Sequence, residues 1–578
     1  MYADSALLGA LSEAVALADP PLYQTFLSHY VLCVGSVAEL GSPAADPAGG
    51  LDHARTKGSF MVTELGDASS HLGPRTVATY EPATGGFLLT TPDPGAAKFS
   101  SVGTAGAAGT PPQQAVVCAR LQVGERDGGV FSFLVDITAE SGKPAPGVAL
   151  SDPLDLADLP LPYAAVEFAE VRLDRARWLA DGARIDADGL LQDPAGSPAA
   201  RLQRTLGVGR ALWGTLPRAM AATALRGAAL ACRFSARRPS HGALAAGAPV
   251  LAYRTHCYAL ASALAEAYAL RCAADRAWTR WAATREQPAP GGTSGGTSGG
   301  SAGSPGRPAG PMAFSPWAAV DGTLAVHKAL ATRGAARVLT ECQHRCGVSG
   351  FWAANRLSGY LGLARAFENA GGDNTLILLD AGRALAEQPP GPPPPAPPQD
   401  PLDPAWWPAT AALLRHRLHA ELHRAAAATG GSPPPDPFAH WNPLLPQALR
   451  LGEVLAQCHA ADALTETAAD ATLVPPPDAA RLLAALHGIV QARRFGTDLL
   501  GAGLLDRAGV HRLATAADRL CALLGPDLAE LAATLDPGVT QCQVPMLARP
   551  SGAGTTHPEA GAPGADAGTP RAAAGAPR

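Results

Sequence analysis

The sequence has few charged residues of either sign. Asp, Glu, Lys and Arg make up only 16% of the 578 residues, and the formal net charge is −5. Proteins that bind nucleic acid usually carry a basic domain or a basic stripe on one face. This composition therefore argues against a nucleic-acid partner.

Cysteine is present but thinly spread. Ten cysteines are scattered along a chain that is too long to need a disulfide framework. The run CQHRC places Cys342, His344 and Cys346 close together, but the second pair of ligands of a structural zinc site is not found nearby. We therefore expect reduced thiols that pack in the core, and no metal site.

Long apolar runs are also missing. No stretch of about 18 residues lacks polar breaks, so we expect no membrane span. The first residues, MYADSALLGALSEAVAL, have no basic region of the kind that begins a signal peptide. The last residues, AAAGAPR, are not the Ser-Lys-Leu peroxisomal signal. Together these features predict a cytoplasmic protein.

What the chain does contain is abundant alanine, leucine, glycine and proline. The 63 Gly and 54 Pro, with more Arg than Lys, are typical of a bacterial coding sequence rich in G and C. Hydrophobic residues make up 47%, which is enough for a large core. The length alone predicts two to four domains.

Residue patterns predict an α+β chain of several domains. Helical periodicity with a break at Asp19-Pro20-Pro21 comes first, and short runs rich in β-formers, separated by Gly, Pro and Asp, then predict an antiparallel, barrel-like domain. Long amphipathic segments predict a helical bundle and, after a Pro-rich spacer, a second helical domain. The predicted parts are a short N-terminal helical region (1–57), the β domain (58–172), the bundle (198–387) with a Gly/Ser linker (287–311), the Pro-rich linker (388–403), the second helical domain (404–548) and a disordered tail (549–578).

The segment LARAFENAGGDNTLILLDAGRALAE, residues 363–387, interrupts a helical pattern. Gly371 and Gly372 are poor helix residues, and Asn and Asp favour caps and turns. A carboxylate, Glu368, stands in the last turn before this break. The residues alone leave two interpretations open: an ordinary turn between helices, or a loop that holds Glu368 over a ligand.

Several motifs follow one another in a fixed order. They are TELG, ATYEP, a strand that ends in TTP, CRFSARRPS, ECQHRCGVSGF and AFENAGGDNT. This collinear set, from about residue 20 to 390, resembles the acyl-CoA oxidases, flavoproteins of the acyl-CoA dehydrogenase superfamily. The family form of the last motif is Thr-Phe-Glu-Gly-Glu-Asn-Thr, so this chain carries extra residues after Glu368. The second helical domain resembles the extra C-terminal domain of the oxidases.

The resemblance implies an FAD-dependent acyl-CoA oxidase of fatty-acid β-oxidation. Such an enzyme converts an acyl thioester and O2 to the trans-2-enoyl thioester and H2O2. The α proton is weakly acidic, so this chemistry needs a base within hydrogen-bond reach and donors to the thioester oxygen. The resemblance assigns Glu368 as the base, the β domain as the flavin-binding domain, and a homodimer as the assembly. The residues that it assigns to FAD are Thr63, Gly66, Gly103 and Arg237.

Two alternatives stay open at this point. The first is a dehydrogenase that passes electrons to a protein acceptor, or that takes its acyl group from a carrier protein. The second is a catalytically degenerate homologue that binds acyl groups.

Overall fold

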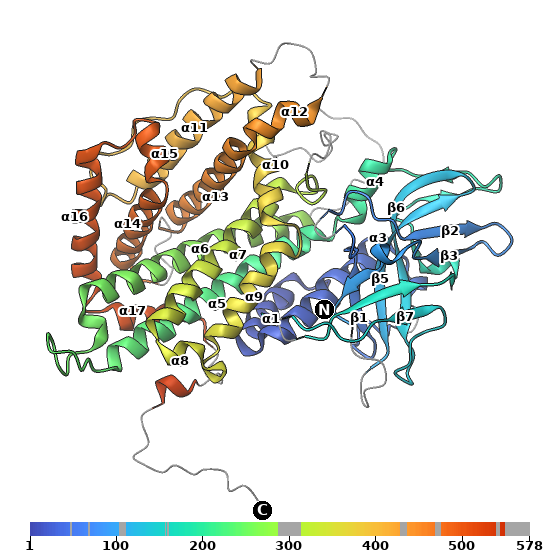
Figure 1. The fold of residues 1–578 in the computed structure, drawn as a ribbon, viewed down its shortest axis with the longest axis horizontal. Helices are drawn as coiled ribbons and strands as arrows, with labels where there is room; N and C mark the ends of the chain where they lie inside the picture. Colours follow the sequence, from blue (N-terminus) through green and yellow to red (C-terminus); the bar gives the residue numbers. More distant parts are fainter. Residues whose placement is uncertain are drawn as a thin grey trace, which may run out of the picture.

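The structure, a computed structural model, describes residues 1–46, 49–67, 70–102, 111–156, 158, 161–286, 314–427, 436–468, 475–538 and 544–548. A β domain forms one end of the molecule and helices form the rest (Figure 1). This arrangement confirms the predicted fold class. The predicted Gly/Ser linker, the predicted tail and Gly103 lie outside the described residues.

The N-terminal region is helical, with the predicted break in place. It contains α1 (Ser5–Ala18), α2 (Pro20–Phe26), the π-helical stretch η1 (Leu27–Val34) and α3 (Gly35–Leu40). Asp19 ends α1, and its side chain accepts a hydrogen bond from the Leu22 amide and so caps α2. Single-turn π stretches within helices are frequent at functional sites, and η1 contributes to the cavity described below.

The β domain is a seven-stranded sheet with a second, three-stranded sheet against it. The larger sheet has the order β10-β6-β5-β2-β3-β9 with β1 beside β5, and the smaller has the order β4-β8-β7. The strands of these two sheets and of a separate two-stranded ribbon are β1 (Lys57–Met61), β2 (Val77–Glu81), β3 (Gly86–Thr90), β4 (Lys98–Ser100), β5 (Gln113–Val123), β6 (Arg126–Thr138), β7 (Val148–Leu150), β8 (Ala164–Phe168), β9 (Val171–Leu173), β10 (Trp178–Leu179), β11 (Arg184–Ile185) and β12 (Leu191–Gln192).

The strand pairing is mixed, whereas the sequence predicted an antiparallel domain. Most neighbours are antiparallel, but β1 and β2 both run parallel to β5. The reason is that β5 has 11 residues, so one edge accommodates two shorter strands, β1 along 113–117 and β2 along 120–122. Strands also continue beyond residue 172, as far as Gln192.

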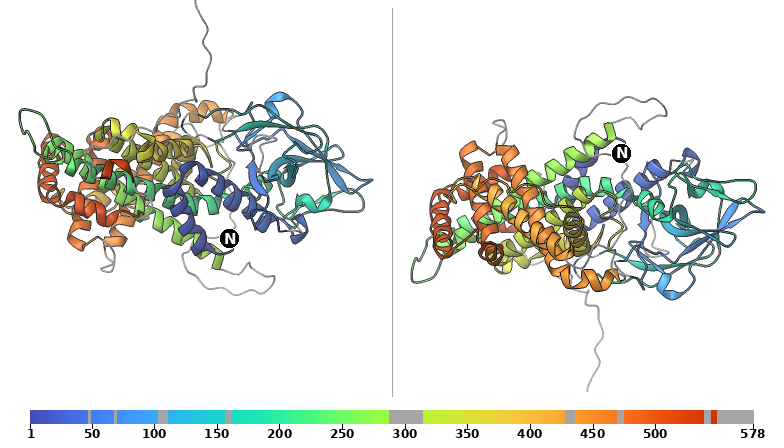
Figure 2. Two further views of the ribbon diagram at one scale, coloured as in Figure 1. Left: turned by 90° about the horizontal axis from the view of Figure 1, so that it is seen from below. Right: turned by 90° about the horizontal axis from the view of Figure 1, so that it is seen from above.

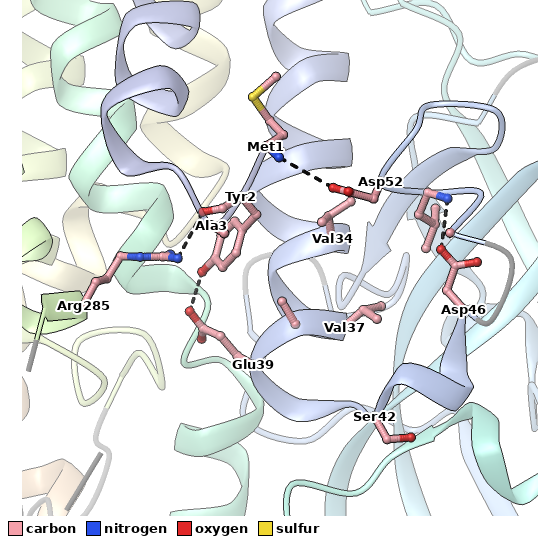
Figure 3. Close-up of a pocket in the computed structure, with 13 residues that line it drawn as sticks. Met1, Tyr2, Ala3, Val34, Val37, Glu39, Ser42, Asp46, Asp52 and Arg285 are labelled. Atoms are coloured by element: carbon pink, nitrogen blue, oxygen red, sulfur yellow. Dashed lines mark hydrogen bonds and ion pairs between the residues drawn. The ribbon is translucent and has the colours of Figure 1, made fainter. Parts of the chain in front are cut away.

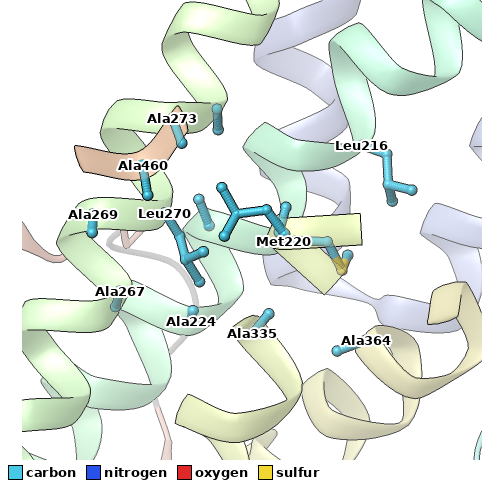
Figure 4. Packing of buried hydrophobic residues seen from close by; sticks show 14 of the residues in the cluster. Leu216, Met220, Ala224, Ala267, Ala269, Leu270, Ala273, Ala335, Ala364 and Ala460 are labelled. Atoms are coloured by element: carbon cyan, nitrogen blue, oxygen red, sulfur yellow. The ribbon is translucent and has the colours of Figure 1, made fainter. Parts of the chain in front are cut away.

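Long helices that pack closely form the bundle. Its helices are α4 (Pro198–Thr205), α5 (Gly209–Arg237), α6 (Arg254–Glu286), α7 (Gly322–Arg345), α8 (Val348–Phe351), α9 (Leu357–Asn369) and α10 (Asn374–Ala386). Alanines of α5, α6 and α7 surround Leu270 and Met220 in the core (Figure 4). Small residues let these helices approach: a Cβ on Gly214 would lie 2.7 Å from the Trp281 ring.

The second helical domain packs against the bundle (Figures 1 and 2). Its helices are α11 (Trp406–Ala427), α12 (Pro437–Trp441), α13 (Leu445–Ala468), α14 (Pro477–Arg494), α15 (Gly496–Gly501), α16 (Arg507–Leu524) and α17 (Leu528–Leu535). Helices α10 and α13 meet backbone to backbone. A Cβ on Gly382 would lie 1.9 Å from the Ala448 carbonyl oxygen, and one on Gly452 would lie 2.1 Å from that of Leu378.

Three further findings concern the described residues. The nine cysteines within them are all buried and free of disulfides. In the same part of the chain, no helix is both long and apolar enough to cross a bilayer, and no group of three or more His, Cys, Asp or Glu is arranged to hold a metal ion.

Candidate active site

A cavity of about 540 Å³ lies where the β domain meets the helices. Its wall comes from η1, from the residues after β1 and β4, from α5 and from the end of α9. Most of the wall is apolar: Leu27, Leu32, Phe60, Val62, Leu65, Phe99, Leu156, Leu212 and Phe367. Such a site, apolar with a few fixed polar groups, is typical of small-molecule and cofactor pockets.

Thr63, two residues after the end of β1, is oriented by two side chains that also line this cavity. The indole N–H of Trp317 donates to Nδ1 of His71 at 2.8 Å, and Nε2 of His71 lies 3.1 Å from Oγ1 of Thr63. Because an indole nitrogen can only donate, His71 carries its proton on Nε2 and donates to Thr63. Burial lowers the pKa of His71 to about 4, with a further contribution from the positive charge of Lys98, so the ring is neutral at pH 7. The hydroxyl proton of Thr63 is thus left for a ligand.

An unpaired acceptor completes the polar part of the wall. The side-chain amide of Gln24 donates to the Tyr163 hydroxyl at 3.0 Å. Its Oε1 atom is buried and has no hydrogen-bond partner in the described part of the chain. A buried polar atom without a protein partner is costly, so this oxygen is available to accept a hydrogen bond from a ligand. The cavity therefore offers both a donor and an acceptor.

The break between α9 and α10 forms a turn at the cavity edge. Ala370 and Gly371 line the cavity, and Gly371 and Gly372 have φ values of +70° and +98°, a backbone region that side chains with a Cβ seldom adopt. The Gly371 carbonyl accepts from the Trp213 indole at 3.0 Å, and the Gly372 carbonyl accepts from Nζ of Lys328. Across the described ranges, the amide N–H groups of these two glycines have no hydrogen-bond partner.

Lys328 of α7 is a fully buried cation behind this turn. Besides the Gly372 carbonyl, its Nζ donates to Oδ1 of Asn374 at 3.0 Å. Burial lowers the pKa of Lys328 to about 7, against the opposing effect of the Asp373 and Glu368 carboxylates. The lysine therefore holds the glycine turn in place at a cost in desolvation.

Replacement of Lys328 by Met is expected to change how stability depends on pH. Lys328 titrates near 7 when folded and near 10.4 when unfolded. Between these values the unfolded state binds more protons, so the free energy of unfolding rises with pH across this window and is independent of this group below it. Urea denaturation at several alkaline pH values should show that the free energy of unfolding rises less with pH in Lys328→Met than in the parent. The exposed Lys143→Met is the control, and identical slopes in all three proteins would contradict the assignment.

The comparisons with known proteins fit this architecture. Residues 214–386 match the model of the acyl-CoA oxidase C-alpha1 domain. Acyl-coenzyme A oxidase 3 of Yarrowia lipolytica is 27% identical over 346 residues, which cover 57% of this chain and 45% of that protein. The bundle therefore carries an acyl-CoA oxidase C-alpha1 domain, and the chain is similar to acyl-CoA oxidases over a longer stretch. It spans about half the length, or less, of the curated relatives it matches.

Solved structures of acyl-CoA oxidases share the fold. Acyl-CoA oxidase 1 of Y. lipolytica superposes with a TM-score of 0.74 at 19% identity, covering 94% of this chain and 81% of that one. Acyl-CoA oxidase 2 of Caenorhabditis elegans, solved with FAD, ascaroside-CoA and ATP, has a TM-score of 0.73 at 17% identity, covering 88% and 75%.

Glu368 does not lie on the cavity wall. We expected the break in the helix to release it, but α9 continues to Asn369, so Glu368 stays in the last helical turn and is half-buried. Its neighbours Phe367 and Asn369 do line the cavity. The three extra residues of the motif explain the shift: counted back from Asn374, the glutamate position of the family motif falls on Gly371.

The one carboxylate on the cavity wall, among the described residues, is Glu64. It accepts from Nζ of the fully buried Lys98 at 2.8 Å, and also from the hydroxyl and amide of Thr76 and the amide of Arg75. Burial opposes ionisation of Glu64, but these donors outweigh it and lower its pKa. Glu64 is therefore an ionised carboxylate whose hydrogen bonds hold segments of the β domain together.

Two other predicted FAD contacts lie away from the cavity wall. Gly66 packs against the loop before β4, where its amide donates to the Gly95 carbonyl at 2.8 Å. Arg237, exposed at the end of α5, donates to the Leu547 carbonyl at 2.9 Å. Their contacts with FAD, like that of Gly103, stay predictions. Thr63 is the predicted FAD contact that does line the cavity.

Sequence reasoning missed four residues of this site: Gln24, His71, Trp317 and Lys328. None belongs to a motif. A lysine, Lys328, within the otherwise apolar face of α7 was the one local signal, since buried lysines are rare unless paired.

A second cavity, of about 550 Å³, lies beside the N-terminal helices (Figure 3). Its polar groups bond to one another: the Tyr2 hydroxyl donates to Glu39, Arg285 donates to the Tyr2 carbonyl at 3.0 Å, and the Met1 amino group lies 3.7 Å from Asp52. Because these groups satisfy each other, we assign no ligand to this cavity.

Proposed function

We propose that the chain is an FAD-dependent acyl-CoA oxidase. The reaction is acyl-CoA plus O2 to trans-2-enoyl-CoA plus H2O2. The observation that carries the proposal is the apolar cavity between sheet and bundle, with the Thr63 hydroxyl and the Gln24 carbonyl as its free donor and acceptor, in a chain of this family.

The polar groups of the cavity fit a flavin ring. An isoalloxazine presents carbonyl oxygens that would accept from the Thr63 hydroxyl and an N–H group that would donate to Oε1 of Gln24. The mostly apolar cavity wall suits its flat faces. The FAD in the C. elegans relative supports this assignment. When bound, FAD accepts the hydride equivalent from the β carbon and passes the electrons to O2.

The glycine turn supplies the other half of the proposed chemistry. The amide N–H groups of Gly371 and Gly372 are donors for the thioester oxygen, on which negative charge develops as the α proton leaves. Trp213 and Lys328 hold the carbonyls of the same residues, which fixes the turn. We assign the proton abstraction to Glu368, which requires its side chain to turn towards the cavity.

Replacement of His71 by Leu is expected to weaken FAD binding about fivefold. The Thr63 hydroxyl then loses its orienting donor, which is worth about 1 kcal/mol. Titration of the apoprotein with FAD, followed by flavin fluorescence, measures this change. His241→Leu, at an exposed position, is the control, and Thr63→Val should add little to His71→Leu because both act on one hydrogen bond. An unchanged affinity for FAD in His71→Leu would show that this histidine does not position Thr63.

Absorbance spectroscopy of the purified protein tests the function directly. A yellow protein that acyl-CoA bleaches without air, and that regains colour in air with release of H2O2, is the expected result. Slow return of colour would favour the dehydrogenase alternative with a protein acceptor. No bound flavin after addition of FAD would refute both.

One observation favours a second candidate, a homologue that binds acyl-CoA without oxidising it. Gly371 stands on the cavity wall where the family motif has glutamate, and Glu368 does not line the wall. This candidate predicts that acyl-CoA binds and perturbs the flavin spectrum but never bleaches it.

We also propose that the protein forms a homodimer, the assembly that its resemblance to the acyl-CoA oxidases implies. The supporting feature is an exposed apolar patch at α8: Val348 is 87% exposed, Phe351 58% and Trp352 57%. Exposed patches of this kind on a soluble protein mark interaction sites. Sedimentation of the purified protein measures the state, and a monomer at micromolar concentration would contradict the proposal.

A further inference from the structure

A separate small cavity, of about 130 Å³, lies between the bundle and the second helical domain. Helices α7, α10, α13 and α14 form it, and it shares no lining residue with the cavity of the candidate active site. Four arginines line it: Arg333, Arg337, Arg450 and Arg494. Their side chains are between 25% and 35% exposed, so solvent reaches the cavity.

Three carboxylates surround these four guanidinium groups, which leaves one positive charge in excess. The carboxylates are Glu266, Glu453 and Asp498. Burial opposes ionisation of Glu266, but Arg337 and Arg494 outweigh it and hold its pKa at about 2. Glu266 is therefore ionised at pH 7, and the ion pairs with the three carboxylates fix the guanidinium groups in place.

Several hydrogen-bonding atoms at this cavity are still unused. Nη1 of Arg337 and the Nε atoms of Arg333 and Arg494 have no partner within the ranges that the structure describes. Gln457, which also lines the cavity, is 6% exposed, and its Oε1 atom has no partner there either. The site therefore presents spare cationic donors together with one buried acceptor.

We propose that this cavity binds free monohydrogen phosphate. Arginine forks match phosphate oxygens in charge and geometry. Unlike sulfate, monohydrogen phosphate also carries an O–H group, which can donate to Oε1 of Gln457. The small volume favours the free ion over the phosphoryl group of a larger molecule. The ion would join α7 of the bundle to α13 and α14 of the second domain, a role independent of the proposed oxidase activity.

Calorimetric titration of the full chain with inorganic phosphate, sulfate and a phosphate monoester dianion, at matched ionic strength and pH 7.5, tests the proposal. We expect saturable binding of phosphate with an affinity about tenfold above that of the other two. Gln457→Met keeps all charges and should remove this preference while leaving sulfate binding unchanged. Arg337→Met should lower the affinity for phosphate and for sulfate about tenfold. Arg481→Met, at an exposed position of α14, should change neither affinity.

Three outcomes would overturn the proposal. They are absence of phosphate binding, equal binding of sulfate or of the monoester, and an unchanged preference in Gln457→Met. Because Arg337→Met leaves Glu266 with one partner fewer and can lower stability, the charge-neutral Gln457→Met decides the question on its own.

Discussion

Glu368→Gln is expected to bind FAD normally and to slow bleaching by acyl-CoA by about 10²- to 10⁴-fold. A general base contributes an effect of this size, and glutamine keeps the shape of the side chain while removing its basicity. Stopped-flow absorbance under anaerobic conditions measures the rate. Glu387→Gln, close to the end of α10 and with its side chain 49% exposed, is the matched control and should bleach at the parent rate.

The result also separates the two candidate functions. If the parent bleaches and Glu368→Gln bleaches equally fast, the base is another residue. The parent could instead bind FAD and acyl-CoA without ever bleaching. In that case no base reaches the substrate, Gly371 stands on the cavity wall in place of the glutamate, and the protein only binds acyl groups.

Gly382→Ala and Gly452→Ala are each expected to lower the free energy of unfolding by about 1–3 kcal/mol, the usual cost of overpacking. The added methyl group meets a backbone carbonyl of the facing helix at 1.9 Å and 2.1 Å respectively, and a backbone atom cannot rotate away as a side chain can. Helices α10 and α13 must then separate. Urea denaturation measures the change, with Gly391→Ala as the control because no atom lies within 4 Å of its Cβ position.

The double variant is expected to cost less than the sum of the single ones. Once the helices have moved apart for the first methyl group, the second finds space already made, and residues in contact are not additive. Single variants within about 0.5 kcal/mol of the parent, the range typical of surface substitutions, would show that the crossing is looser than described.

Local features of the fold could be predicted where one residue type decides the backbone. Asp19 before two prolines ends one helix and caps the next, and the glycines at 371 and 372 separate α9 from α10. The parallel pairing of β1 and β2 with β5 could not be predicted, because alternation along a strand gives its faces but not the direction of its neighbours.

In the candidate active site, too, some features could be predicted from the sequence and others could not. Thr63 was predicted from a motif and lies on the cavity wall. The hydrogen bond that orients it through His71 ends at Trp317, 246 residues further along the chain, and no local pattern reveals such a contact. The position of Glu368 was missed because the motif shows that residues are inserted, but not that they extend α9 by a further residue.

Helix α10 connects the glycine turn at the cavity to the second helical domain. It has 13 residues, about 20 Å at the rise of an α-helix. It begins at the glycine turn beside the cavity and is held against α13 near its other end by Gly382. We expect a ligand that displaces the turn to shift α10, and with it the contact that α10 makes with α13 of the second domain. We therefore expect substitutions in α13 that lie far from the cavity to alter the affinity for a ligand bound there.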